Sequence, residues 1–229
     1  GVCRGGSNSL REGKGIRLSV FPVLIFDLDG TLVDSKKDLT SSVNHVRTTF
    51  HLPELTEYEI AGFIGDGAQM MIQRALGADA PESDVHAGLQ LFLSYYRDHM
   101  LDQSKLYPGV SETLQRLADH RLAVLTNKPI RFSQRMLEGL GILGHFGAVY
   151  GGNSFERKKP DPVGILQILA DTKGQPETTW MIGDSAVDVL TGRNAGVKTC
   201  GVSWGYATDS FKTTPPDFVI HRFEELEEV

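Results

Sequence analysis

The sequence predicts an α/β fold: a Rossmann-like parallel sheet core with a small helical domain inserted after the first strand. Two observations lead to this prediction. From residue 110 onward, short apolar runs alternate with helical patterns, as in strands joined by helical crossovers. Residues 35–105, in contrast, carry helical periodicity and no convincing strand. A chain of 229 residues suits one large α/β domain or a core with a smaller insertion.

The predicted core comprises residues 21–34 and 106–229, and the predicted helical domain is the segment 35–105 between them. Residues 1–20 are rich in Gly, Ser, Arg and Lys and lack the apolar stretch of a signal peptide. We expect them to form a flexible leader and assign them no function.

The first predicted strand is the apolar run Val23–Phe26, which leads into the string Asp-Leu-Asp-Gly-Thr at residues 27–31. A short apolar run bounded by a turn is typical of an interior parallel strand. Side chains two apart on an extended backbone point the same way, so Asp27 and Asp29 face one crevice. Carboxylates held this close repel unless a cation lies between them, and Mg²⁺ prefers such ligands. Asp also caps helices and shapes turns, but the whole string rarely arises by chance.

The remaining elements follow in order along the chain. Within the inserted segment, helical spacing covers 39–50, 69–76 and 85–100, and a turn at 106–109 returns the chain to the core. The helices beyond it are expected at 110–120, 131–140, 162–170 and 187–195. The strands are expected at 122–125, 148–150, 179–182, 199–202 and 218–220, before an acidic terminal helix.

Polar residues follow later strands in the same way. Residues 126–129 read Thr-Asn-Lys-Pro, residues 183–185 read Gly-Asp-Ser with Asp188 following, and residues 158–162 between them read Lys-Lys-Pro-Asp-Pro. Because ligands of open α/β sheets bind beyond the carboxyl ends of the strands, these groups are expected to converge. Carboxylates, a hydroxyl, turn amides and a lysine together suit phosphoryl transfer. Each string alone is explained equally well by a cap, a turn or a surface charge.

Composition excludes several classes of function. A net charge of −6 argues against a nucleic-acid binder, and no apolar run is long enough to span a bilayer. The two cysteines, Cys3 and Cys200, suggest no disulfide framework, which fits a cytoplasmic protein. None of the seven histidines forms a metal-ligand spacing with Cys. For residues 204–206, Trp-Gly-Tyr, we expect loop packing, with a position at the edge of the site as the alternative.

In this order, the motifs closely resemble those of the haloacid dehalogenase superfamily, and of its phosphoglycolate phosphatase branch in particular. The resemblance covers nearly everything from Val23 to Val229 and implies that the helical insertion is a cap domain. The matching motifs are Asp27-x-Asp29-Gly-Thr-Leu, Thr126-Asn127-Lys128-Pro129, Lys159-Pro160-x-Pro162 and Gly183-Asp184-Ser185-x-x-Asp188.

The resemblance also implies roles for the catalytic residues. Asp27 would attack phosphorus and become an aspartyl phosphate, while Asp29 would protonate the departing alkoxide and then deprotonate the hydrolytic water. Lys159 would offset the charge on Asp27 and on the transferring group. Thr126 and Asn127 would hold phosphoryl oxygens.

The metal ion implied by the resemblance is Mg²⁺. An oxygen of Asp27, the backbone carbonyl of Asp29 and the carboxylate of Asp184 would bind it. Asp188, one helical turn beyond Asp184, would orient a metal-bound water.

The implied substrate is a small phosphomonoester. The cap sequence Phe-Ile-Gly-Asp-Gly-Ala at 63–68 resembles a loop of phosphoglycolate phosphatases, so 2-phosphoglycolate is the expected substrate. Its leaving group carries a carboxylate, and Arg74 is a candidate to bind it, as are Lys36 and Lys37. No nucleic-acid or membrane partner is expected, and the protein is expected to be a monomer or a homodimer.

Two alternatives stay open. A sugar-phosphate mutase or sugar phosphatase of the same fold would use the same motifs. A non-catalytic phosphate-sensing protein could use the aspartyl site as a switch.

Overall fold

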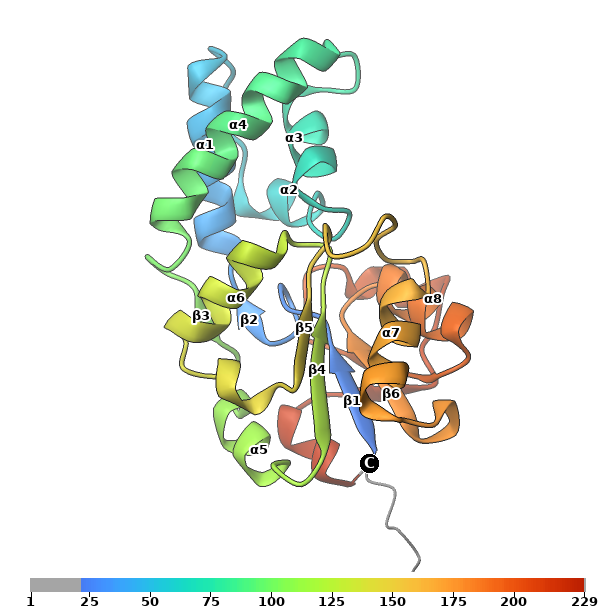
Figure 1. Ribbon diagram of the computed structural model, residues 1–229. Coiled ribbons are helices and arrows are strands. Elements are labelled where there is room, and N and C mark those ends of the chain that lie inside the picture. Colours follow the sequence, from blue (N-terminus) through green and yellow to red (C-terminus); the bar gives the residue numbers. More distant parts are fainter. Residues whose placement is uncertain (1–21, 229) are drawn as a thin grey trace, which may run out of the picture.

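The computed structural model describes residues 22–228, so the expected leader lies outside the described residues. Its core is a six-stranded parallel sheet with the strand order β5-β4-β1-β6-β7-β8 (Figure 1). The strands are β1 (Val23–Phe26), β4 (Arg121–Leu125), β5 (Ala148–Tyr150), β6 (Thr179–Gly183), β7 (Lys198–Val202) and β8 (Phe218–Ile220). The predicted α/β fold with a parallel sheet is confirmed.

Strand β1 lies at the centre of the sheet, and its position sets the location of the acidic string that follows it. The strand is buried throughout, and Phe26 is in register with Val124 of β4 and Ile182 of β6. The ladder continues by one further bond, from the Asp27 amide to the Ile182 carbonyl at 2.9 Å. Residues after β1, β4 and β6 therefore emerge side by side at one edge of the sheet.

Helices cover both faces of the sheet because alternate strand residues point to opposite sides. The helices are α5 (Val110–Arg116), α6 (Ile130–Gly139), α7 (Val163–Thr172) and α8 (Ala186–Ala195). Leu24 and Phe26 belong to the apolar cluster that includes residues of α5 and α6. Val23 and Ile25 belong to a second cluster with α7. Figure 1 shows these helices on either side of the sheet.

A helical insert, which we define as residues 35–104, lies beyond the carboxyl ends of the strands and at the top of Figure 1. Its helices are α1 (Lys36–Thr49), α2 (Glu57–Ala61), α3 (Ala68–Leu76) and α4 (Glu82–His99). A short ribbon, made of β2 (Val33–Asp34) and antiparallel β3 (Lys105–Leu106), joins it to the core. The buried Asp38 carboxylate accepts bonds from the Gln103 and Ser104 amides and ties the two connecting segments together.

Four short elements differ from the sequence expectations. Strands β2 and β3 have two residues each, too few to show an alternating pattern. Helix α2 has five residues, although Thr56 and Glu59 form a capping box at its start that is legible in the sequence. The expected acidic terminal helix is the 3-10 helix η4 (Phe223–Glu228), held to the core through buried Phe223 and Leu226. No helix within residues 22–228 has the length and apolar character needed to cross a membrane.

Candidate active site

A small cavity of about 50 Å³ lies between the carboxyl ends of the central strands and the insert. Its polar lining comes from the core, apart from Tyr96 of the insert, and its apolar lining comes mostly from the insert and α6. The lining residues are Asp27, Asp29, Leu39, Ile64, Gly65, Gly67, Ala68, Met71, Phe92, Tyr96, Thr126, Asn127, Lys128, Pro129 and Phe132.

A buried charge network lies behind the first carboxylate. The Lys159 ammonium lies 3.0 Å from Asp27 Oδ1 and 2.6 Å from Asp188 Oδ1. The other oxygen of Asp188 accepts bonds from the backbone amide and hydroxyl of Ser185 at the start of α8. Asp188 thus caps its own helix and holds Lys159 against Asp27 at the same time.

Asp184 follows β6 and completes the acidic group. Its carboxylate accepts a bond of 2.6 Å from the backbone amide of Tyr206. The aromatic stretch 204–206, which the sequence assigned to loop packing, therefore positions a site carboxylate. Trp204 fits the packing role, since its indole donates to the Thr31 carbonyl. The backbone contact of Tyr206 carries no side-chain signature, so the sequence did not indicate it.

Burial and like charge shift the acidity of this group. Burial raises the pKa of Asp27 to about 6, and the Lys159 ammonium limits that rise. Burial and the negative charges of Asp188 and Asp27 raise the pKa of Asp184 to about 8. At Lys159, burial alone would lower the pKa, but Asp188 and Asp27 outweigh burial and raise it.

These residues fit a divalent cation. Asp27, Asp184 and Asp188 each offer a carboxylate oxygen, and the three oxygens lie within 4.8 Å of one another. All three residues are buried, and one lysine faces the group. A compact, buried set of oxygen donors with excess negative charge is what Mg²⁺ favours. The carboxylate of Asp188 belongs to this set of possible metal ligands. From the sequence, we expected Asp188 only to orient a metal-bound water.

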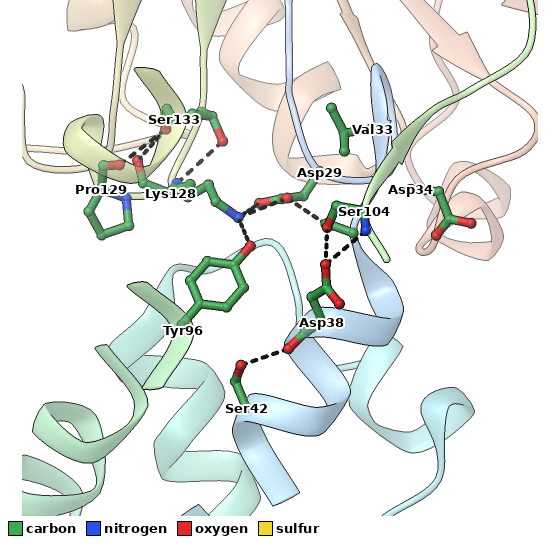
Figure 2. Close-up of polar contacts among 12 residues, drawn as sticks. Asp29, Val33, Asp34, Asp38, Ser42, Tyr96, Ser104, Lys128, Pro129 and Ser133 are labelled. Atoms are coloured by element: carbon green, nitrogen blue, oxygen red, sulfur yellow. Dashed lines mark hydrogen bonds and ion pairs between the residues drawn. The ribbon is translucent and has the colours of Figure 1, made fainter. Parts of the chain in front are cut away.

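Asp29 is not part of this acidic group. Figure 2 shows it facing Lys128 and the insert residue Tyr96. The Ser35 hydroxyl donates to Asp29 Oδ1 at 2.6 Å, and the Lys128 ammonium lies 3.0 Å from each carboxylate oxygen. The side chain of Asp29 is 11% exposed and lines the cavity together with Asp27. The two carboxylates predicted to face one crevice therefore meet at one cavity, each with its own lysine.

Thr126 and Asn127 also reach the cavity, at the end of β4. The Thr126 hydroxyl accepts a bond from the backbone amide of Lys128 and can still donate its own proton. The side-chain amide of Asn127 donates to the Gly65 carbonyl of the insert and to the Lys159 carbonyl, joining three segments.

The structure does not bring Arg74 to the cavity. Its guanidinium, on α3, pairs with Asp66 at 2.5 Å and donates to the Phe63 carbonyl, so it shapes the loop 62–67. That loop reaches the core, since Gly65 and Gly67 line the cavity. The ammonium of Lys158 donates to the Asp66 carbonyl from the core side.

Lys128 and Tyr96 are site residues that sequence reasoning missed. Lys128 was quoted within its motif but given no role, and Tyr96 was read only as part of a helical pattern. Figure 2 shows the Lys128 ammonium between the Asp29 carboxylate and the Tyr96 hydroxyl, to which it donates at 2.6 Å. The position of Lys128 at the end of a strand was the available signal.

Comparison with known proteins identifies the family. Residues 24–202 match the haloacid dehalogenase-like hydrolase family. The chain is 39% identical over 210 residues to the phosphoglycolate phosphatase of Agrobacterium fabrum, covering 90% of each chain. It is 36% identical over 216 residues to that of Haemophilus influenzae, covering 90% of this chain and 96% of the relative.

Solved structures agree with this assignment. A crystal structure of a predicted phosphoglycolate phosphatase from Haemophilus somnus superposes with a TM-score of 0.86 at 31% identity, covering 92% of this chain and 98% of the other. A haloacid dehalogenase-like family hydrolase from Streptococcus pneumoniae superposes with a TM-score of 0.82 at 25% identity, covering 92% and 99%. The chain belongs to the haloacid dehalogenase-like hydrolase family.

Proposed function

We propose that the protein is a magnesium-dependent phosphatase of small phosphomonoesters and that its substrate is 2-phosphoglycolate. The observation that supports this proposal most directly is that Asp27 and Asp29 line one small cavity under a helical insert, while Lys159 and Asp184 lie close to the Asp27 carboxylate. We infer the substrate from the similar proteins of Agrobacterium fabrum and Haemophilus influenzae, which are named phosphoglycolate phosphatases.

The first chemical step belongs to Asp27. Its carboxylate attacks phosphorus, the bond from phosphorus to the ester oxygen breaks, and an aspartyl phosphate forms. Lys159, held at 3.0 Å by its second contact with Asp188, offsets the charge on Asp27. The Thr126 hydroxyl and the backbone amide of Asn127, at the end of β4, hold the phosphoryl oxygens.

Asp29 moves the protons. It donates one to the departing alkoxide and later removes one from the water that hydrolyses the aspartyl phosphate, so Asp27 and Asp29 both return to their starting states. Ser35 and Lys128 direct the Asp29 carboxylate through contacts of 2.6 and 3.0 Å.

Asp27, Asp184 and the backbone carbonyl of Asp29 would hold the metal ion, with the Asp188 carboxylate adjacent. Mg²⁺ bound there would supply positive charge for the phosphoryl oxygens. The helical insert acts as a cap that shields the acyl phosphate from bulk water. The free, buried thiol of Cys200 supports a reducing compartment, and we place the enzyme in the cytoplasm as a monomer or homodimer.

Phosphate release from 2-phosphoglycolate, ethyl phosphate, a hexose phosphate and p-nitrophenyl phosphate tests the proposal. We expect 2-phosphoglycolate to give the highest kcat/KM, release to require magnesium, and Asp27→Asn to lower kcat by about 10³-fold or more because it removes the nucleophile.

The matched control is Asp209→Asn, which changes an exposed aspartate that pairs with Lys212 and does not line the cavity, and it should leave turnover unchanged. Substantial phosphate release by Asp27→Asn would overturn the mechanism. A higher kcat/KM for the hexose phosphate would overturn the substrate assignment. Conversion of a sugar phosphate without release of phosphate would indicate a mutase instead.

A further inference from the structure

Lys128, a cationic side chain that lines the cavity, has no part in the phosphate and metal contacts described above. Among the described residues that line the cavity, Lys128 is the single lysine or arginine. Its side chain is 5% exposed, and a buried ammonium needs compensating partners. The Lys128 ammonium lies 3.0 Å from each carboxylate oxygen of Asp29, which supplies one negative charge. The Tyr96 hydroxyl supplies a second, neutral acceptor. Lys128 therefore places a positive charge on the side of Asp29 that faces the insert.

Tyr96 adds a hydrogen-bond donor at the same place. Burial raises the pKa of Tyr96 well above its ordinary value, so its hydroxyl keeps its proton. The oxygen accepts the Lys128 bond, which leaves the hydroxyl proton for another acceptor. An ammonium and a hydroxyl side by side form a binding site for one carboxylate.

The rest of this wall is apolar. Leu39, Met71, Phe92 and Phe132 line the cavity around Lys128 and Tyr96. Such a wall can accept a methylene group, but it offers no partner for the hydroxyl groups of a sugar, whose burial without hydrogen bonds is unfavourable. With a volume of about 50 Å³, the cavity also favours a leaving group of few atoms.

The connectivity of a 2-hydroxy acid matches this arrangement. Asp29 must lie within hydrogen-bond reach of the ester oxygen to protonate it. In the phosphate ester of a 2-hydroxy acid, the carboxylate carbon is two bonds from that oxygen. The carboxylate therefore falls next to Asp29 on the insert side, where Lys128 contacts Asp29 at 3.0 Å.

We propose that Lys128, assisted by Tyr96, binds the carboxylate of the leaving group and selects phosphate esters of short 2-hydroxy acids. This inference rests on the proposed phosphatase function and names the residues that carry its substrate choice. Lys128 is a core residue and Tyr96 belongs to α4 of the insert, so carboxylate recognition requires the two parts to be together.

Substitution of Lys128 by Met tests the inference, since Met keeps the length of the side chain and removes its charge. The two substrates to compare are 2-phosphoglycolate and ethyl phosphate, which has a methyl group in place of the carboxylate. We expect Lys128→Met to lower kcat/KM for 2-phosphoglycolate at least about tenfold more than for ethyl phosphate, since a hydrogen bond to a charged group contributes about 1.5–3 kcal/mol. Lys128→Arg, which keeps the charge, should restore part of the preference, and Tyr96→Phe should lower it by a smaller factor.

Lys158→Met serves as the matched control, because Lys158 contacts the insert loop and does not line the cavity. It should change both substrates by the same factor. Equal losses for both substrates in Lys128→Met would mean that Lys128 acts only through Asp29 and would overturn the inference. A wild-type protein that hydrolyses ethyl phosphate but shows no preference for 2-phosphoglycolate would overturn the substrate assignment itself. Direct titration of 2-phosphoglycolate into Asp27→Asn, with and without Lys128→Met, measures the contribution of Lys128 to binding in the absence of turnover. Equal affinities of the two proteins would contradict the inference.

Discussion

Two glycines let the backbone close around the Asp184 carboxylate. A Cβ atom at Gly205 would lie 2.1 Å from the Cβ of Asp184, and one at Gly30 would lie 2.4 Å from its Oδ2. Gly30 also has φ of +83°, a conformation that other residues rarely adopt. The direction of Asp184 is thus set by backbone contact on two sides and by the Tyr206 amide.

Gly205→Ala should therefore weaken metal binding. The added methyl group must displace Asp184, and disturbing the support of a metal ligand typically lowers metal affinity about tenfold or more. We expect the magnesium concentration for half-maximal phosphate release to rise by roughly that factor, with a smaller loss of kcat at saturating magnesium. Magnesium titration of the initial rate measures both quantities.

Gly144→Ala is the control for this experiment, because a Cβ atom there would meet nothing within 4 Å. Its magnesium dependence should match that of the wild type. An unchanged magnesium dependence in folded Gly205→Ala would show that Asp184 is not a metal ligand or that its position tolerates the shift.

At the scale of elements, the loop 62–67 between α2 and α3 connects the insert to the part of the core that carries Asn127 and Lys158. Core residues donate to it at two consecutive carbonyls, Asn127 to Gly65 and Lys158 to Asp66. Arg74 holds the loop from the insert side through Asp66. These bonds can form only when the insert lies against the core. We therefore expect them to favour this closed arrangement.

Lys158→Met should make closure less favourable. The bond from Lys158 is exposed, so its loss is expected to cost about 0.5–1 kcal/mol, which corresponds to a two- to fivefold decrease of kcat/KM. The decrease should come mainly from KM, and hydrogen exchange should become faster in residues 62–67. Lys212→Met, which removes an exposed lysine paired only with Asp209, should change neither quantity. Loss of kcat without faster exchange would contradict a role in closure.

The elements that the sequence predicted well are those with enough residues to show a period. The helix expected at 131–140 is found at Ile130–Gly139, and the helix expected at 187–195 begins one residue earlier. The ribbon of β2 and β3 was missed because two-residue strands carry no pattern and their pairing joins positions about 70 residues apart.

For the whole molecule, the site was legible wherever a residue directly follows a strand. Asp27 follows β1, Thr126 follows β4 and Asp184 follows β6, and parallel register brings these ends together without further information. The same logic cannot reach the insert, because its orientation over the sheet depends on contacts such as Lys128 with Tyr96. For this reason the sequence pointed to Arg74 and not to Lys128 as the carboxylate ligand, whereas Arg74 pairs with Asp66, eight residues away.

The acidic group makes the stability of the whole molecule depend on pH and on magnesium together. In the folded protein the pKa values of Asp27 and Asp184 are raised to about 6 and about 8, from 3.8. Between pH 3.8 and these values the folded protein holds more protons than the unfolded chain, so this contribution to stability decreases as pH rises. Below pH 3.8 both carboxyls are protonated in both states, and above about pH 8 the unfavourable contribution is complete.

Magnesium should offset this loss, because it binds the ionised carboxylates of the folded protein and competes with their protons. The increase of Tm caused by excess magnesium is therefore expected to grow from about pH 5 to about pH 8. At about 100 times Kd it corresponds to about 2.7 kcal/mol, or roughly 5–10 °C for a chain of this size. Thermal melting with and without magnesium across this range measures the effect, and Asp184→Asn should abolish most of it. An increase that is the same at every pH, or largest at the acidic end, would contradict a metal site built from these carboxylates.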